Sequence, residues 1–164
     1  MTEPQALDLA DDDTATQIWH LQRAAYAVEA ELIGFDGIPP LRESLAELRS
    51  CGESFLGTHD AEGLVGAVSW LLDANGTLDI CRLVVHPRAH CTGVATRLLD
   101  ALDALVPATR ATVSTGTANT PALALYRSRG FRPVGTTEIA PGVTLSTLER
   151  RCPLARSGMR PDRG

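Results

Sequence analysis

The sequence contains no lysine, and all 15 of its basic residues are arginines. With 20 acidic residues, the net charge is −5 at pH 7. A domain that binds nucleic acids in general is expected to be basic, so this balance argues against a nucleic-acid partner. The sequence is also rich in alanine and leucine. We interpret the absence of lysine as part of this compositional bias and assign it no functional meaning.

Cysteine is scarce, and its spacing matches no common metal pattern. Cys51, Cys81, Cys91 and Cys152 form no C-x-x-C pair and have no histidine pair nearby, which argues against a zinc site. A chain with 44% hydrophobic residues does not need a disulfide framework, and free thiols suit a reducing compartment. We therefore expect neither a bound metal nor disulfides.

Long hydrophobic runs and targeting segments are also missing. The longest mostly apolar run, Gly63 to Leu72, is about half the length that a membrane-spanning helix requires. The first residues, MTEPQALDLADDD, are acidic and lack both the basic region and the apolar stretch of a signal peptide. These absences predict a cytoplasmic protein with no membrane partner.

What is present is a composition close to the globular average, with 21% charged residues in a chain of 164. This length suits one domain, which we place at residues 1–150. We expect a loose arginine-rich tail at residues 151–164. No internal repeat or low-complexity block interrupts the chain.

Hydrophobic periodicity, helix caps and turn signals predict an element order of β-α-α-β-β-β-α-β-α-β-β. Mostly antiparallel strands followed by two β-α crossovers indicate an α+β layer fold. The predicted elements are a strand at 6–9, helices at 14–30 and around 41–48, strands at 54–58, 64–72 and 77–85, a helix at 94–105, a strand at 112–114, a helix from 120 to Gly130, and strands at 131–134 and 143–148.

The stretch LVVHPRAHCTGVATRLL at residues 83–99 predicts a strand, a turn and a helix that begins at a loop of small residues. A helix N-terminus presents unpaired N–H groups and a partial positive charge, which suits a pyrophosphate. Gly93 and Ala95 would let the backbone approach such an anion closely. Many helices begin with a glycine, so a plain strand-to-helix turn is the alternative for this loop taken alone.

A second segment, NTPALALYRSRGF at residues 119–131, matches the pattern N-x-x-A-x-x-(L/F)-Y-x-x-x-G-F at every fixed position. It follows the first motif at the distance of one helix and one strand. Together the two segments resemble the GNAT superfamily of N-acetyltransferases, whose acyl-CoA motif is (Q/R)-x-x-G-x-(G/A). The resemblance is specific over Leu78 to Phe131 and looser toward both ends. It predicts an acetyl-CoA-dependent N-acetyltransferase, with a non-catalytic acyl-CoA-binding module as the alternative.

This resemblance implies a mixed, mostly antiparallel central sheet that splays open at its middle, with helices on both faces. The pantetheine arm of acetyl-CoA would lie between strands 77–85 and 112–114. The implied cofactor-binding groups are strand backbone, the backbone of the helix-start loop and two side chains of the second motif, and they belong to Leu83, Val84, Val85, His90, Cys91, Thr92, Gly93, Val94, Ala95, Thr96, Asn119 and Tyr126.

Two residues of the helix-start loop need comment. The family motif carries Gln or Arg where this chain has His90, which offers fewer donors and only a partial charge near neutral pH. His90 either contacts a phosphate or lies exposed at the surface. Cys91 lies at a helix N-terminus, where thiol pKa values fall, although a small residue that contributes only its backbone is the plainer interpretation.

Acetyl transfer to an amine needs a deprotonated amine, a stabilised oxyanion and help for the leaving thiolate. By resemblance, the Leu83 N–H is the oxyanion donor and the Tyr126 phenol faces the CoA sulfur. Proton transfer from a phenol of pKa about 10 to a thiolate of pKa about 8.5 is uphill by about 2 kcal/mol, so Tyr126 is expected to donate a hydrogen bond. A core tyrosine is the alternative.

The candidate base is Asp79, four residues before Leu83, because strand alternation predicts both on one face. Many family members carry a glutamate at this position, and an ordinary strand carboxylate is the alternative. Glu29 and Glu31, at the end of the first helix, are rival bases and, with Phe35, candidate substrate-binding residues.

The resemblance implies that the acceptor enters between the first two helices and the final hairpin. The acidic rim there suits a cationic amine on a small molecule or a protein, or is ordinary solubilising charge, and it consists of Glu29, Glu31, Asp36 and Glu138. Phe35 and the turn at residues 38–40 suggest an apolar wall as well.

The strand at Val143 to Leu148 is a candidate sheet edge. An uncovered edge tends to pair with another chain unless it is blunted. A two-fold homodimer would cover this edge and leave both active sites open. We therefore expect a homodimer, with a monomer as the alternative if the arginine-rich tail blunts the edge.

Overall fold

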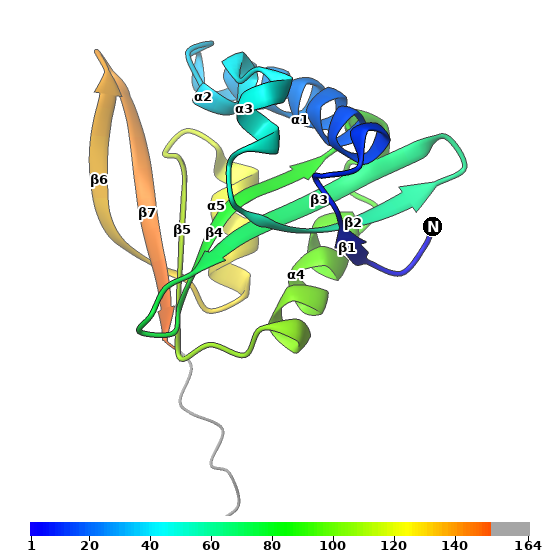
Figure 1. Ribbon diagram of the computed structural model, residues 1–164. Coiled ribbons are helices and arrows are strands. Elements are labelled where there is room, and N and C mark those ends of the chain that lie inside the picture. The colour runs from blue at the N-terminus through cyan, green and yellow to red at the C-terminus, as the bar shows by residue number, and fades with distance from the viewer. Residues whose placement is uncertain (152–164) are drawn as a thin grey trace, which may run out of the picture.

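The computed structural model describes residues 1–151 as a seven-stranded sheet with helices on both faces (Figure 1). The elements are β1 (Gln5–Leu7), α1 (Asp12–Ile33), α2 (Pro39–Arg42), α3 (Leu45–Arg49), β2 (Ser54–Asp60), β3 (Gly63–Leu72), β4 (Thr77–Val85), a 3-10 turn η1 (Pro87–Ala89), α4 (Val94–Leu105), β5 (Arg110–Gly116), α5 (Thr120–Ser128), β6 (Arg132–Ala140) and β7 (Val143–Arg151). Arg151 thus ends β7, and the rest of the predicted tail lies outside the described residues.

The sheet order is β1-β2-β3-β4-β5-β7-β6. Strands β4 and β5 are parallel, whereas all the other neighbours pair in antiparallel fashion. The predicted α+β class is therefore confirmed, and the element order agrees except that the helix predicted around residues 41–48 consists of two short helices, α2 and α3. The prediction that Val143 to Leu148 is a sheet edge is wrong, because β7 lies between β5 and β6, and β6 is the edge. The homodimer itself stays a prediction.

Helix α1 shows how the sequence sets the bounds of an element. The Asp11 carboxylate accepts a hydrogen bond from the Thr14 N–H at 3.0 Å, which caps the helix start. Gly34 ends the helix in the left-handed region, at φ +67°, where a glycine adopts this conformation without a steric penalty. The helix is therefore longer than the predicted range of 14–30, and its last turn reaches the end of β5, where Ile33 lies beside Gly116.

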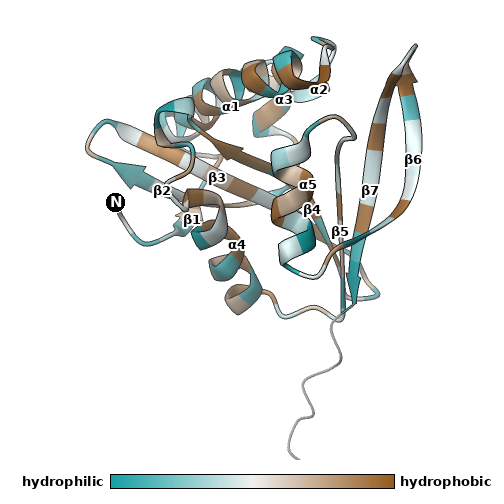
Figure 2. Cartoon of the chain, turned by 180° about the vertical axis from the view of Figure 1, so that it is seen from behind, coloured by the Kyte–Doolittle hydropathy of each residue, from teal (hydrophilic) through white to brown (hydrophobic). Residues whose placement is uncertain are grey.

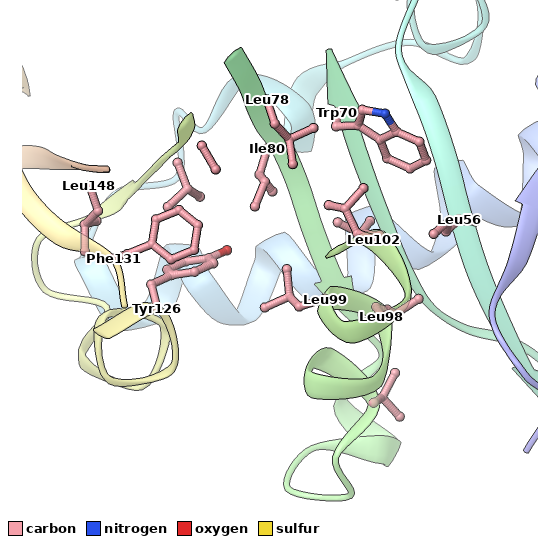
Figure 3. Packing of buried hydrophobic residues seen from close by; sticks show 14 of the residues in the cluster. Leu56, Trp70, Leu78, Ile80, Leu98, Leu99, Leu102, Tyr126, Phe131 and Leu148 are labelled. Atoms are coloured by element: carbon pink, nitrogen blue, oxygen red, sulfur yellow. The ribbon is translucent and has the colours of Figure 1, made fainter. Parts of the chain in front are cut away.

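Two apolar cores lie on opposite faces of the sheet. The larger core packs α4 and α5 against the sheet, and Figure 3 shows Leu98, Leu99 and Leu102 of α4 beside residues of β4. The second core lies under α1 and includes Ile18, Leu21 and other residues from α1, α3 and the strands. Hydrophobic positions are accordingly concentrated where the helices face the strands (Figure 2).

Halfway along its length, strand β4 loses one of its two partner strands, and its side chains switch faces. It pairs with β5 only from Thr77 to Ile80, so the two strands separate beyond that point, as the predicted splay requires. On its other side, the register with β3 shifts at Cys81, which forms a β-bulge. A bulge inserts one residue and changes which side chains share a face. Leu78 and Ile80 therefore belong to the core under α4 and α5, whereas Arg82 faces the side of α1.

Candidate active site

A cavity of about 790 Å³ opens where β4 and β5 separate. Its floor consists of residues 80–85 of β4 and 113–115 of β5. One end reaches the loop before α4 and the start of that helix, and the other end lies among the second half of α1, the residues around α2, and Ile139 and Leu145 of the β6–β7 hairpin. In Figure 1 the tip of this hairpin lies at the same end of the molecule as α2.

The helix-start loop lines the cavity and leaves the first turn of α4 without a side-chain cap. Gly93 is the N-cap of α4 at φ +83°, and no side chain caps the helix. A Cβ added at Gly93 would have no atom within 4 Å, so the space beside it is open. Cys91 also has a positive φ, at +62°. The first N–H groups of α4 lack helical partners and are available to an anion.

The structure brings most of the predicted cofactor-binding residues into this one cavity. Its lining includes Leu83, Val84, Val85, His90, Cys91, Gly93, Val94, Ala95, Thr96, Asn119 and Tyr126. Thr92 is not part of the lining, and its hydroxyl donates to the Ala89 carbonyl at 2.5 Å. The His90 side chain is exposed at the cavity rim, so both interpretations of this residue are still open.

Tyr126 reaches the cavity from α5 and is only 4% exposed. Its ring packs edge-on against Phe131, with 5.6 Å between the ring centroids, and Figure 3 shows its hydroxyl pointing toward β4. Burial, assisted by the charge of Glu29, raises the pKa of Tyr126 well above its ordinary value. The phenol is therefore protonated at neutral pH and can donate a hydrogen bond.

Glu29 is the carboxylate that faces the cavity. The Thr115 hydroxyl lies 3.4 Å from Glu29 Oε1 and donates to it, and Asn119 Nδ2 donates to that hydroxyl at 3.5 Å. Burial raises the pKa of Glu29, although hydrogen bonds from Asn119, Gly116 and Thr115 oppose the rise. A partly desolvated carboxylate of this kind is a stronger base than one in water.

Gly116 allows this arrangement because it has no side chain. A Cβ at this position would lie 2.6 Å from Cγ2 of Ile33, which belongs to the last turn of α1. The end of α1 can therefore approach the end of β5 closely, and this approach brings Glu29 within reach of Thr115 and Asn119.

The predicted pairing of Asp79 with Leu83 on one face is wrong. The bulge at Cys81 interrupts the alternation, so Leu83 packs against the core under α4 and α5, whereas Asp79 lies on the opposite face from Ile80 of that core. Asp79 is exposed, accepts a hydrogen bond from the Thr112 hydroxyl at 3.0 Å and does not line the cavity.

Two of the three predicted substrate-binding residues also lie away from the cavity. Glu31 is exposed on α1 and is not part of the lining. Phe35 folds back over its own loop, where its ring would lie 2.4 Å from a Cβ at Gly37, and it packs against the core under α1. Glu29 alone of the three lines the cavity.

Arg82 is a cavity residue that the sequence analysis did not single out. It is 7% exposed and forms bidentate pairs with Glu43 and Glu53 at 2.5–3.0 Å, and it also donates to Gln22 Oε1 at 2.8 Å. Burial alone would raise the pKa of Glu53, but hydrogen bonds from Arg82 and Ser69 outweigh it and hold that pKa below its usual value. The cluster joins the segment after α2 to β4.

Tyr26 and Cys81 were also missed. Tyr26 is a second buried phenol in the cavity, and burial raises its pKa well above the ordinary value. Burial, together with the nearby carboxylates Glu53 and Asp79, raises the pKa of Cys81 to about 12, so this thiol stays protonated. The helical spacing of apolar residues predicted that Tyr26 lies in a helix but not that it lines a cavity. The bulge that places Cys81 in the cavity has no sequence signal that we recognise.

Comparison with known proteins assigns the family. The chain matches the Acetyltransferase (GNAT) family over residues 15–131, which is most of its length. The chain belongs to the GNAT family. This membership confirms the resemblance carried by the two motifs and identifies the matched region as an acetyltransferase domain of the GNAT family.

Individual relatives agree with this assignment. UPF0157 protein YqkA of Bacillus subtilis (strain 168) is 38% identical over 135 residues, which cover 82% of this chain and 39% of that protein, so the chain spans about two fifths of this relative's length. The ribosomal-protein-S18-alanine N-acetyltransferase of Escherichia coli has a TM-score of 0.76 at 14% identity, covering 97% of this chain and 99% of that one. An aminoglycoside 6'-N-acetyltransferase complexed with coenzyme A has a TM-score of 0.68 at 14% identity, covering 92% and 97%. At these identities the two solved structures show a shared fold.

The described residues contain neither a membrane-spanning helix nor a cluster of metal-binding side chains. No helix within residues 1–151 is long and apolar enough to cross a membrane. In the same part of the chain, no three histidine, cysteine, aspartate or glutamate residues cluster in a way that could hold a metal ion.

Proposed function

We propose that this GNAT domain transfers the acetyl group of acetyl-CoA to a primary amine by direct attack within a ternary complex. One observation carries the proposal: a single cavity runs from the backbone loop at the start of α4, along the separated strands β4 and β5, to the Glu29 carboxylate. Both substrates can therefore meet beside Leu83 and Tyr126.

The residues at the α4 end fit the diphosphate and pantetheine of acetyl-CoA. The uncapped first turn of α4 offers N–H groups and the positive end of a helix dipole, and the space beside Gly93 is open. The gap between β4 and β5 offers unpaired strand backbone for the amide groups of the pantetheine arm. The similar aminoglycoside 6'-N-acetyltransferase was solved with coenzyme A bound, which supports the same use of the fold here.

Strand geometry supports Leu83 as the oxyanion donor. The His86 N–H points toward β3, because it donates to the Val65 carbonyl at 2.9 Å. Successive N–H groups of a strand point in opposite directions, so those of Val85 and Leu83 point away from β3 and into the gap beside β5. The Leu83 N–H is therefore free to stabilise negative charge on the reacting carbonyl oxygen.

Tyr126 assists the leaving thiolate as a hydrogen-bond donor. Because burial raises the pKa of this phenol further, full proton transfer to a thiolate is even less favourable than for a tyrosine in water. We infer that the phenol stays protonated and stabilises the sulfur while a proton leaves the attacking amine.

Glu29, rather than Asp79, is the carboxylate that we propose to receive that proton, directly or through water. It lines the cavity and its pKa is raised by burial, whereas Asp79 lies outside the cavity and bonds to Thr112. General bases of this kind contribute about 10²–10⁴ in rate.

The test is release of free CoA thiol from acetyl-CoA on addition of a broad panel of amines. We expect amine-dependent release that falls about 100-fold or more in Glu29→Gln. Glu31→Gln is the matched control, because Glu31 belongs to the same helix but lies outside the cavity, and it should keep wild-type turnover. Tight acetyl-CoA binding without turnover on any amine would instead favour the non-catalytic acyl-CoA-binding module.

A further inference from the structure

The acceptor end of the cavity is lined mainly by apolar side chains from three separate parts of the chain. Leu32 and Ile139 are 48% and 38% exposed, although both face the cavity. Exposed apolar groups that gather at a pocket are usually covered by a ligand. The apolar side chains at this end are those of Leu32, Ile33, Ile38, Pro39, Ile139 and Leu145.

The charge at this end is limited to one usable carboxylate. Among the described residues that line the cavity, Glu29 is the only acidic one. Arg82 also lines it, but its guanidinium is held by Glu43 and Glu53. The other acidic residues of the predicted rim lie outside the cavity, and Asp36 forms an ion pair with Arg42 at 3.6 Å.

We infer that the acceptor is a primary amine whose single positive charge is carried on an apolar body. This inference rests on the proposed function and specifies its substrate class. Glu29 would pair with the one ammonium group, and the apolar walls would cover the rest of the molecule. A second ammonium within the cavity would lose its hydration without gaining a carboxylate partner, which is unfavourable.

Ile139 owes its place in the wall to an irregularity of β6. The pairing of β6 with β7 skips this residue, because the register shifts between Glu138 and Ala140. Bulges of this kind redirect side chains beside active sites. The pairing of β6 with β7 also skips Val134, because the register shifts between Pro133 and Gly135. Val134 is 60% exposed but does not line the cavity. Val134 is therefore a matched control for Ile139.

The substrate test compares two amines of equal chain length, hexylamine and hexamethylenediamine, in the CoA-release assay with the full chain. We expect kcat/KM for hexylamine to exceed that for the diamine by about tenfold or more, since the second ammonium has no partner. Turnover in which the diamine equals or exceeds hexylamine would overturn the substrate class and leave the proposed function intact. No turnover with any amine would overturn the proposed function itself, and the inference with it.

The wall is tested separately by truncation. In Ile139→Ala, KM for hexylamine should rise about three- to tenfold, because apolar area that the alkyl chain would cover is lost. KM for ethylamine, whose body is too short to use the wall, should stay within about twofold, and Val134→Ala should change neither value. Equal KM values for hexylamine in Ile139→Ala and in the wild type would contradict the assignment of this wall.

Discussion

At the α4 end of the cavity, the groups that we propose to bind the cofactor are backbone N–H groups from a short stretch of the chain, Cys91 and Gly93 to Thr96. At the α1 end, they are side chains from α1, α2, β6 and β7, brought together by the tertiary fold. The backbone end tolerates most side chains but depends on φ angles and open space. The side-chain end depends on the identity and placement of each residue, so substitutions there should alter the acceptor and its reaction rather than cofactor binding.

Tyr126 lies between these two ends, and its hydroxyl should have the largest effect on rate. Tyr126→Phe removes one hydroxyl and keeps the ring packed against Phe131, so kcat should fall by about 10²–10⁴. The free energy of unfolding should change by no more than about 1–2 kcal/mol.

Tyr26→Phe sharpens this prediction, because Tyr26 is the other buried phenol of the cavity. We expect kcat, measured by steady-state kinetics of both variants, to fall by less than about tenfold in Tyr26→Phe. Wild-type turnover in Tyr126→Phe would show that Tyr126 serves only the core. An equal loss in both variants would mean that the two phenols act as one unit.

The Arg82 cluster tests whether the side-chain end depends on a buried charge. Arg82→Met would leave Glu43 and Glu53 buried without their partner, which should lower the free energy of unfolding at pH 7 by about 3–5 kcal/mol. Arg88→Met is the control, because Arg88 pairs with Asp60 at the surface, where solvent screens the pair, and removing it should have little effect on stability.

Chemical denaturation across pH completes this test. Folding lowers the pKa of Glu53 in the wild type, so its stabilising contribution is present above about pH 4.5 and is lost as the pH falls through the folded-state pKa. The deficit of Arg82→Met should therefore shrink as the pH falls from about 4.5 through the folded-state pKa of Glu53, below which this carboxyl is protonated in both the folded and the unfolded state. A deficit independent of pH would mean that Arg82 stabilises by packing alone.

The difference between the two ends also explains what the sequence could predict. The α4 end depends on short, continuous stretches of sequence. These are the glycine-containing loop at the helix start and the N-x-x-A-x-x-(L/F)-Y-x-x-x-G-F segment. Local motifs of this kind can be recognised in a sequence, and eleven of the twelve predicted cofactor-binding residues line the cavity. The splay between β4 and β5 followed from the same resemblance, and the register confirms it.

The resemblance placed the acceptor end between the first two helices and the final hairpin, but most of its individual residues could not be predicted, since they depend on contacts distant in sequence. The prediction that Asp79 and Leu83 share a face assumed strict alternation of side chains along the strand. The bulge at Cys81 inserts one residue and breaks that alternation, and the sequence pattern does not reveal such an insertion. The apolar wall depends on a second bulge at Ile139 in β6, a strand predicted to end near residue 134. The Arg82 cluster joins segments up to 60 residues apart.

The backbone end is tested by Gly93→Glu. The new carboxylate would lie at the helix start, where the diphosphate is proposed to bind, and like charges at close range cost several kcal/mol. We expect acetyl-CoA binding, measured by calorimetry, to weaken about 100-fold, which corresponds to about 3 kcal/mol.

The matched control for this change is Gly76→Glu in the β3–β4 turn. Gly76 has φ +79° against +83° for Gly93, and an added Cβ has no atom within 4 Å at either position. Both variants therefore carry the same backbone strain, and only Gly93→Glu should lose binding. Unchanged binding in Gly93→Glu would contradict the proposed cofactor site, and an equal loss in both would point to strain rather than charge.

The smallest expected effect is a gain in stability at the side-chain end. Folding raises the pKa of Glu29 because the residue is partly buried, so the folded state favours the protonated carboxyl. Its contribution is therefore fully favourable below about pH 4.5 and becomes a penalty as the pH rises through the folded-state pKa. In Glu29→Gln the side chain at position 29 carries no charge at any pH. This variant should be more stable than the wild type by about 1 kcal/mol at pH 8, with little difference below pH 4.5.

The same variant should lose amine acetylation, because the proposed reaction requires a carboxylate at a position where the folded protein would be more stable without one. Urea denaturation at both pH values measures the difference, and a loss of stability at pH 8 would instead show that the hydrogen bond from Thr115 makes Glu29 a structural residue.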